Sequence, residues 1–251
     1  AGLWCASLGY GNNELIEAAR EQMSRLSFSH LFGGRSHEPA IELAEKIKEI
    51  SPAPTSKVFF TCSGSEANDT QIKLAWYYNN ARGKPQKKKI ISREKAYHGV
   101  TIATASLTGL GVFHQDFDLP MARIIHADCP HHWRNAEPGE SEEDYATRLA
   151  ANLESLIERE DPDTIAAFIA EPVMGAGGVI VPPATYFEKI QAVLKRHDIA
   201  LIVDEVICGF GRTGNMFGSQ TYGITPDTVT MAKAITSAYM PLGAVTVSED
   251  V

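Results

Sequence analysis

The sequence has no apolar run long enough to cross a membrane and no cysteine spacing typical of a disulfide framework or a zinc site. A membrane-spanning helix needs about 18 or more consecutive apolar residues, and none of the 251 residues starts such a run. The cysteines are Cys5, Cys62, Cys129 and Cys208, with no C-x-x-C pair among them. Isolated cysteines predict a reducing compartment.

Excess positive charge is also absent, because the net charge is −8. A negative net charge argues against nucleic acid or an anionic membrane as the main partner. The sequence shows no signal peptide, so we expect a cytoplasmic protein. It begins without methionine, and an organellar targeting segment further upstream would not be visible.

Residues 128–132, Asp-Cys-Pro-His-His, contain four side chains of types that can bind a metal. Adjacent histidines point in different directions on most backbones, and Pro130 indicates a loop. Metal sites need ligands that converge on one point. We therefore predict no metal.

The spacing of apolar residues predicts alternating helices and strands from about residue 40. Residues 200–203 show no polar alternation, which indicates a strand buried on both faces. This order is typical of an α/β domain with a mostly parallel sheet and helices on both faces. The first forty residues differ, with a strand-like segment at 2–9 and a helix at 13–26. The other predicted helices are 39–50, 66–78, 141–159 and 184–197, and the predicted strands are 58–61, 90–92, 123–125, 164–170, 200–203, 228–231 and 244–247.

Chemically distinctive side chains follow five of the predicted strands. In open parallel sheets the ligand lies beyond the carboxyl ends of the strands. Each feature alone has an ordinary explanation, such as a helix N-cap, a core aromatic or an ion pair. The five features are a Ser-Gly-Ser turn at 63–65 that opens a helix and suits a phosphate, Tyr97 with His98, Glu171, Asp204 with Glu205, and Lys233.

Lys233 has small and apolar neighbours, from Met231 to Ile235. Such a lysine either extends its stem over apolar surface or is a desolvated amine that takes part in chemistry. The other four strand ends favour the second interpretation. A phosphate turn, a flat aromatic, two acids and an amine together fit a ligand with a phosphate, an aromatic ring and an aldehyde. Pyridoxal 5'-phosphate has all three groups.

A glycine motif at residues 209–214, GFGRTG, matches the dinucleotide-binding fingerprint G-x-G-x-x-G. That fingerprint must open a helix and be followed by an acid about twenty residues on. The next residues, NMFG, predict a turn-rich loop instead, and no acid stands at that distance. We therefore expect these glycines to let a loop approach the site. A G-x-S-x-G serine-hydrolase elbow is also absent.

The sequence resembles the class III pyridoxal-phosphate aminotransferases, or ω-aminotransferases. The resemblance runs through nearly the whole chain and includes SGSEANDTQIKLAWYYNN, YHG, FDLP, DCPHHWR, VDEVICGFGRTGNMFG and MAKAITSAYMPLGAV. It implies fold type I, with the α/β domain as the large domain. It is greatest for the branch that moves the amino group of 4-aminobutyrate and related compounds onto pyruvate.

The resemblance also implies a role for each matching position. An imine-forming lysine must be a neutral nucleophile, and apolar surroundings favour the neutral amine. An acid beside the pyridine nitrogen favours the protonated, electron-withdrawing ring. The implied roles are Lys233 as the Schiff-base lysine, Asp204 as the acid at the ring nitrogen, Val206 and Tyr97 on the two ring faces, Gly64 and Ser65 at the phosphate, Glu171 behind the ring and Trp4 in the substrate pocket wall; His98 is expected to bind the cofactor with its neighbour Tyr97.

One position departs from part of the family. Some members that use 2-oxoglutarate carry a second acid five residues after the first, where this chain has Ala176. This favours pyruvate as the acceptor. The chain also ends at Val251, before the region that in the family holds a substrate-carboxylate arginine and a phosphate contact from the partner subunit.

We expect residues 1–38 to belong to a small domain, and residues 39–251 to form the cofactor-binding large domain, truncated at its C-terminus. The C-terminal small domain is expected to be absent. The resemblance implies a homodimer with sites at the interface, so residues 1–251 alone should bind the cofactor weakly. The predicted enzyme transfers an amino group from a small-molecule amine to a 2-oxo acid. The alternatives are another class III reaction (racemase, aminomutase or decarboxylating transaminase) and a non-catalytic scaffold.

Overall fold

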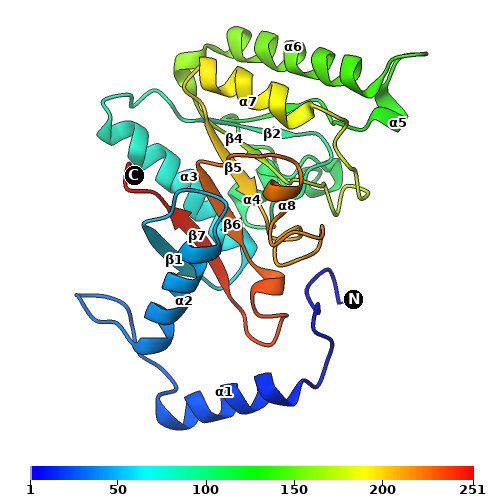
Figure 1. Cartoon of the computed structure of the whole chain (residues 1–251). Helices are drawn as coiled ribbons and strands as arrows, with labels where there is room; N and C mark the ends of the chain where they lie inside the picture. The colour runs from blue at the N-terminus through cyan, green and yellow to red at the C-terminus, as the bar shows by residue number, and fades with distance from the viewer. Residues whose placement is uncertain (1) are drawn as a thin grey trace.

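The computed structural model describes residues 2–251 and is built around one seven-stranded sheet (Figure 1). The strand order is β1-β7-β6-β5-β4-β2-β3. The five strands from β6 to β3 pair in parallel, and β7 is antiparallel to both of its neighbours, β1 and β6. The strands are β1 (Lys57–Thr61), β2 (Lys89–Arg93), β3 (Ile124–Ala127), β4 (Ile165–Ala170), β5 (Ala200–Asp204), β6 (Thr228–Met231) and β7 (Gly243–Val247).

Helices cover both faces of this sheet. Alternate residues of a strand point to opposite faces, and in β5 Leu201 and Val203 pack with α6 and α7, whereas Ile202 packs with α3. The helices α6 and α7 lie side by side on one face (Figure 1). The helices are α1 (Asn13–Arg25), α2 (Glu38–Ile50), α3 (Gly64–Ala81), α4 (Ile102–Leu107), α5 (His132–Asn135), α6 (Glu142–Glu160), α7 (Tyr186–Arg196) and α8 (Gly218–Thr221).

Local chemistry explains where the long helices begin. The Ser141 side chain accepts a hydrogen bond from the Asp144 N–H and caps α6, whose first turn holds three acids. Negatively charged side chains at this position interact favourably with the positive end of the helix dipole and stabilise the start of the helix. From there a stripe of buried residues, including Leu149 and Leu153, joins the core that α6 and α7 form on this face of the sheet. Burial of each such leucine stabilises the fold by about 1.5–3 kcal/mol.

The predicted α/β architecture is confirmed, and so is the burial of residues 200–203 on both faces, apart from a half-buried Ala200. Helix α3 is longer than predicted at both ends: Ser63 caps it, Gly64 and Ser65 begin it, and it continues to Ala81. The one-turn helices α5 and α8 were not predicted, since four residues show no helical periodicity. The short α4 lies in a segment with no amphipathic pattern.

The strand predicted over residues 2–9 is wrong. Residues 2–5 form a turn in which Gly2, Leu3 and Trp4 adopt left-handed φ angles of 58°, 52° and 70°. A left-handed backbone cannot continue a strand. The following helix is confirmed as α1, which buries none of its residues and lies at one end of the molecule (Figure 1). No helix within residues 2–251 is both long and apolar enough to cross a membrane.

Candidate active site

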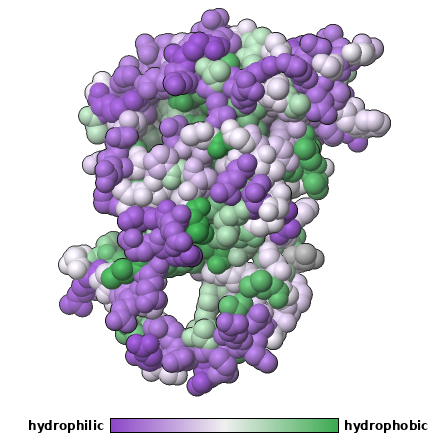
Figure 2. Space-filling model, viewed as in Figure 1, coloured by the Kyte–Doolittle hydropathy of each residue, from purple (hydrophilic) through white to green (hydrophobic). Residues whose placement is uncertain are grey.

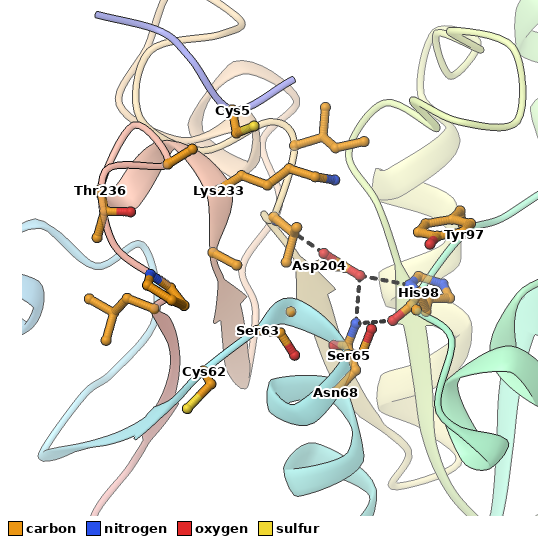
Figure 3. A pocket seen from close by; sticks show the side chains of 18 of the residues that line it. Cys5, Cys62, Ser63, Ser65, Asn68, Tyr97, His98, Asp204, Lys233 and Thr236 are labelled. Carbon is orange, nitrogen blue, oxygen red and sulfur yellow. Dashed lines mark hydrogen bonds and ion pairs between the residues drawn. The ribbon is translucent and has the colours of Figure 1, made fainter. Parts of the chain in front are cut away.

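A cavity of about 470 Å³ lies at the carboxyl ends of the parallel strands. It receives residues from the segments that follow β1, β2, β4, β5 and β6, which are the five strand ends singled out in the sequence. Figure 3 shows the Lys233 side chain lying across this space near Asp204, with Tyr97 and His98 to one side. The lining residues are Cys5, Cys62–Ser65, Asn68, Tyr97–Gly99, Glu171, Asp204, Val206, Ile207, Ala232, Lys233, Thr236, Ala238 and Met240–Leu242.

Eight of the nine predicted site residues line this one cavity, and Trp4 does not. Its neighbour Cys5 lines the cavity instead. The Trp4 ring lies against the guanidinium of Arg212, 5.5 Å from the ring centroid, and Arg212 donates a 2.8 Å hydrogen bond to the Trp4 carbonyl. The turn at residues 2–5 therefore decides which side chain of this segment reaches the cavity.

The Asp204 carboxylate is buried, with 3% of its surface exposed, and is held by three donors. Its Oδ2 accepts a 2.8 Å hydrogen bond from Asn68 Nδ2 and lies 2.8 Å from His98 Nδ1 (Figure 3). Its Oδ1 accepts a 3.0 Å hydrogen bond from the Val206 N–H. An oxygen that accepts a single hydrogen bond can accept another. Asp204 is thus oriented with acceptor capacity left at Oδ1.

Lys233 is half-buried at the end of β6. Burial lowers the pKa of Lys233, because the ammonium form loses hydration, while the carboxylates of Asp204 and Glu171 act in the opposite direction. A lowered pKa raises the fraction of neutral amine at a given pH. The residue therefore has the environment of a nucleophilic amine.

Glu171 ties together the loops that follow β2 and β4. Its Oε1 accepts a 3.0 Å hydrogen bond from the Tyr97 N–H, and its Oε2 accepts a 2.9 Å hydrogen bond from the Gly175 N–H. Burial raises the pKa of Glu171, since the side chain is only 2% exposed. This acid positions the loop that carries Tyr97.

The first turn of α3 forms the floor of the cavity. Ser63 caps the helix by accepting a hydrogen bond from the Glu66 N–H, and the first N–H groups of a helix have no partner within it. A Cβ at Gly64 would lie 3.0 Å from a Val206 methyl group, so a larger residue would have to displace Val206 slightly. The floor combines free N–H groups with the positive end of the helix dipole, which suits an anion.

Gly99 sits behind this turn with a φ of 136°, which L-residues rarely adopt. A Cβ there would lie 2.5 Å from both Ser65 Oγ and Thr104 Oγ1. We expect Gly99→Ala to lower the free energy of unfolding by about 1–3 kcal/mol, through backbone strain and overpacking. Urea unfolding measures this change. The control is Gly111→Ala, where an added Cβ meets nothing within 4 Å; equal losses in the two variants would contradict the prediction.

Asn68 was not predicted from the sequence, although it contacts Asp204 and also donates a 2.9 Å hydrogen bond to the His98 carbonyl. Its spacing from Gly64 could have identified Asn68 as a site residue. Asn68 follows Gly64 by four residues, so in a helix both face the same side. Ala176, the position that lacks a second acid, is exposed and does not line the cavity.

The GFGRTG motif forms a turn-rich loop, as predicted, and no helix begins within it. Phe210, Gly211 and Gly214 adopt positive φ angles, which let the loop reverse direction. Its Arg212 extends to the residues 2–5 turn. Within residues 2–251 no three histidine, cysteine or acidic side chains are grouped to hold a metal.

The sequence profile of the family described as "Aminotransferase class-III" matches residues 1–251. The chain is 61% identical to "Gamma aminobutyrate transaminase 1, mitochondrial" of Solanum lycopersicum, over all of this chain and 49% of that protein. It is 58% identical to "Vanillin aminotransferase" of Capsicum frutescens, over all of this chain and 55% of that protein. The chain thus spans about half the length of the curated relatives it matches.

Solved structures give the same result for the fold. An omega transaminase from Pseudomonas jessenii in complex with PMP superimposes with a TM-score of 0.98 at 59% identity, covering 99% of this chain and 55% of that one. A structure described as "Transaminase with L-ala" has a TM-score of 0.97 at 60% identity, covering 99% of this chain and 58% of that one.

Proposed function

Since the chain belongs to the class-III aminotransferase family, we propose that this cavity binds pyridoxal 5'-phosphate and that the whole protein is a transaminase. It would transfer an amino group from an ω-amino acid or a primary amine to a 2-oxo acid. The observation that carries the proposal is the meeting of a desolvated lysine, a buried oriented carboxylate and a helix N-terminus in one cavity.

The residues of the cavity fit this cofactor. Asp204 Oδ1 accepts one hydrogen bond, from the Val206 N–H, and can accept a second from a protonated ring nitrogen. The first turn of α3 at Gly64 and Ser65 would hold the phosphate, and Tyr97 and Val206 would contact the two faces of the ring.

When bound, the cofactor supplies an electron-withdrawing ring that stabilises negative charge at the substrate carbon. Asp204 would keep the ring nitrogen protonated, since a buried carboxylate favours the adjacent cation. Asn68 and His98 orient that carboxylate. Lys233 would hold the cofactor covalently, and its free amine would move the proton at the donor carbon.

A panel of donors and acceptors tests the substrate class in the full-length protein. We expect transfer from 4-aminobutyrate, β-alanine or simple primary amines, and faster turnover with pyruvate than with 2-oxoglutarate. Ala176 stands where some 2-oxoglutarate-using members of the family carry an acid. It supports the acceptor preference through this family resemblance alone, since it does not line the cavity. The names of the transaminase relatives support the donor class. Faster turnover with 2-oxoglutarate would contradict the acceptor proposal.

The same panel separates the alternatives. Racemisation, amino-group migration or loss of carbon dioxide without transfer would identify another reaction of the family, because one fold supports several reactions. A protein that neither binds the cofactor nor turns over any donor would be a scaffold. The buried environment of Lys233 argues against a scaffold, which has no use for a desolvated amine.

A homodimer with its sites at the interface is proposed as the assembly. Large apolar side chains are exposed along the first 32 residues, and uncovered apolar surface indicates a contact region. In Figure 2 the lower part of the view mixes separate green patches with purple, whereas the upper part over α6 and α7 is mostly purple. Sedimentation of the full-length protein, which gives the mass of the assembly, tests the proposed homodimer. The exposed residues are Leu3, Leu8, Tyr10, Ile16, Met23, Leu26, Phe28, Leu31 and Phe32.

Two further proposals concern organisation and location. Residues 1–38 and 39–251 are proposed as parts of two domains. The proposal is supported by α1, which has no buried residues, and by the sheet, which has its own core. Limited proteolysis tests the boundary.

The cytoplasm is the proposed compartment, supported by four free cysteines. Two relatives are named mitochondrial and chloroplastic, which makes an organelle the alternative; cell fractionation decides between them.

A further inference from the structure

The segment of residues 2–12, here called the strap, is joined to the segment that carries Lys233. The Tyr239 hydroxyl accepts a 2.8 Å hydrogen bond from the Asn12 N–H and lies 3.2 Å from the Gly9 carbonyl, to which it donates. Ser237 Oγ, nearly buried, accepts a 3.0 Å hydrogen bond from the Leu8 N–H. Both hydrogen-bonding capacities of the tyrosine hydroxyl are therefore used between the two segments.

The lysine turn, residues 233–239, has an unfavourable backbone. Lys233, Ser237 and Ala238 adopt φ angles of 51°, 49° and 65°. Residues other than glycine disfavour this left-handed region, so such conformations persist only where surrounding contacts hold them. Within the turn, the Lys233 carbonyl accepts hydrogen bonds from Thr236 and Ala238, both long at 3.3 Å. These two bonds, which tie the turn to Lys233 itself, are longer than the other backbone bonds of the turn, from the Ser237 N–H to the Ala234 carbonyl at 3.1 Å and from the Tyr239 N–H to the Thr236 carbonyl at 3.0 Å.

The Tyr239 hydroxyl adds a restraint on the lysine turn from outside it, through Asn12 and Gly9. It is next to Ala238, whose N–H bonds to the Lys233 carbonyl, so fixing the position of Tyr239 also fixes the closing bond of the turn. Asn12 in turn caps α1 with its side chain. The strap is therefore connected to Lys233 through three links: the Tyr239 hydroxyl, the peptide unit between Ala238 and Tyr239, and the hydrogen bond from the Ala238 N–H to the Lys233 carbonyl.

We propose that Tyr239 is a positioning residue whose hydroxyl, by fastening the lysine turn to the strap, holds Lys233 in the left-handed conformation that places its amine in the cavity. The proposal rests on the proposed function for the role of Lys233. It adds that the strap controls the placement of this amine, although α1 beyond it contributes nothing to the core.

Tyr239→Phe in the full-length holoenzyme tests the proposal, because phenylalanine keeps the ring and removes only the hydroxyl. We expect kcat to fall about fivefold to tenfold, the effect of one or two neutral hydrogen bonds, with the donor KM changed less than about twofold. In the cofactor-free protein, amide exchange over residues 233–239 should become faster. This second measurement does not depend on activity.

The pH profile gives a third readout. The groups that act on the charge of Lys233 are Asp204, Glu171 and Cys5, which favour the ammonium form, and Arg212, which opposes it. Burial lowers the pKa of Lys233 more than any of these. A loosened turn admits water to the amine and raises its pKa, so the rise of kcat with pH should move to higher pH. A loss of global stability alone would not move this profile.

The matched control is Tyr10→Phe, the same change on a tyrosine of the strap that is 82% exposed. A second variant, Ala238→Gly, tests the mechanism, since glycine adopts a left-handed φ without strain. The double variant Tyr239→Phe/Ala238→Gly should have a higher kcat than Tyr239→Phe alone. Its amide exchange over residues 233–239 should be close to that of the single variant Ala238→Gly.

The outcomes separate this proposal from the proposed function. If Tyr239→Phe matches Tyr10→Phe in kcat, pH profile and exchange, the positioning role is wrong while the transaminase function stands. If the wild-type protein transfers no amino group, the proposed function is wrong, and the exchange measurement alone then decides whether the hydroxyl holds the turn. A loss in Tyr239→Phe that glycine at position 238 does not reverse contradicts the proposed mechanism.

Discussion

Lys233→Ala should abolish amino transfer in the full-length protein, lowering the rate by on the order of a thousandfold or more. The substitution removes both the covalent link to the cofactor and the group that moves the proton, and each contributes large factors to such reactions. The half-buried position of the amine, with its lowered pKa, motivates this prediction. Single-turnover measurements with a good donor provide the rate.

A chemical measurement accompanies the kinetic one. The wild-type protein should be yellow, and borohydride reduction should fix the mass of the cofactor on the peptide that contains Lys233. Lys46→Ala is the matched control, because Lys46 is exposed on α2 and its ion pair with Glu49 contributes little. Label on another lysine, or none, would overturn the assignment of Lys233.

Asp204→Asn should slow the half-reaction by on the order of a hundredfold or more while leaving the protein folded. Asparagine has nearly the same shape, but it carries no charge to keep the ring nitrogen protonated. The hydrogen bond from Asn68 and the contact with His98 show how strictly this carboxylate is oriented.

The control for Asp204→Asn is Asp163→Asn, an exposed acid before β4. Urea unfolding of both variants separates loss of function from loss of stability. The rate should fall in Asp204→Asn alone. Near-normal turnover of that variant would mean that Asp204 does not pair with the ring nitrogen. This conclusion would not depend on the role assigned to Lys233.

Most of the candidate site could be predicted from the sequence because parallel strands place their carboxyl ends at one edge of a sheet. Asp204 ends the apolar strand β5 and Lys233 comes after the largely buried strand β6, and no knowledge of strand order was needed to expect them together. The same rule placed Glu171 and Tyr97. The helical spacing of residues 39–50 and 141–159 likewise predicted α2 and α6, since the period of an apolar stripe is a local property.

The sequence by itself thus determined the α/β class and the chemical groups of the cavity. The tertiary structure alone decided the contacts between distant segments. Asn68 reaches Asp204 across 136 residues, and the left-handed turn at residues 2–5 replaces a predicted strand and brings Cys5, not Trp4, to the cavity. Periodicity reports which face of an element is apolar, but left-handed backbone angles are stabilised by packing against other segments. That packing exists only in the folded chain.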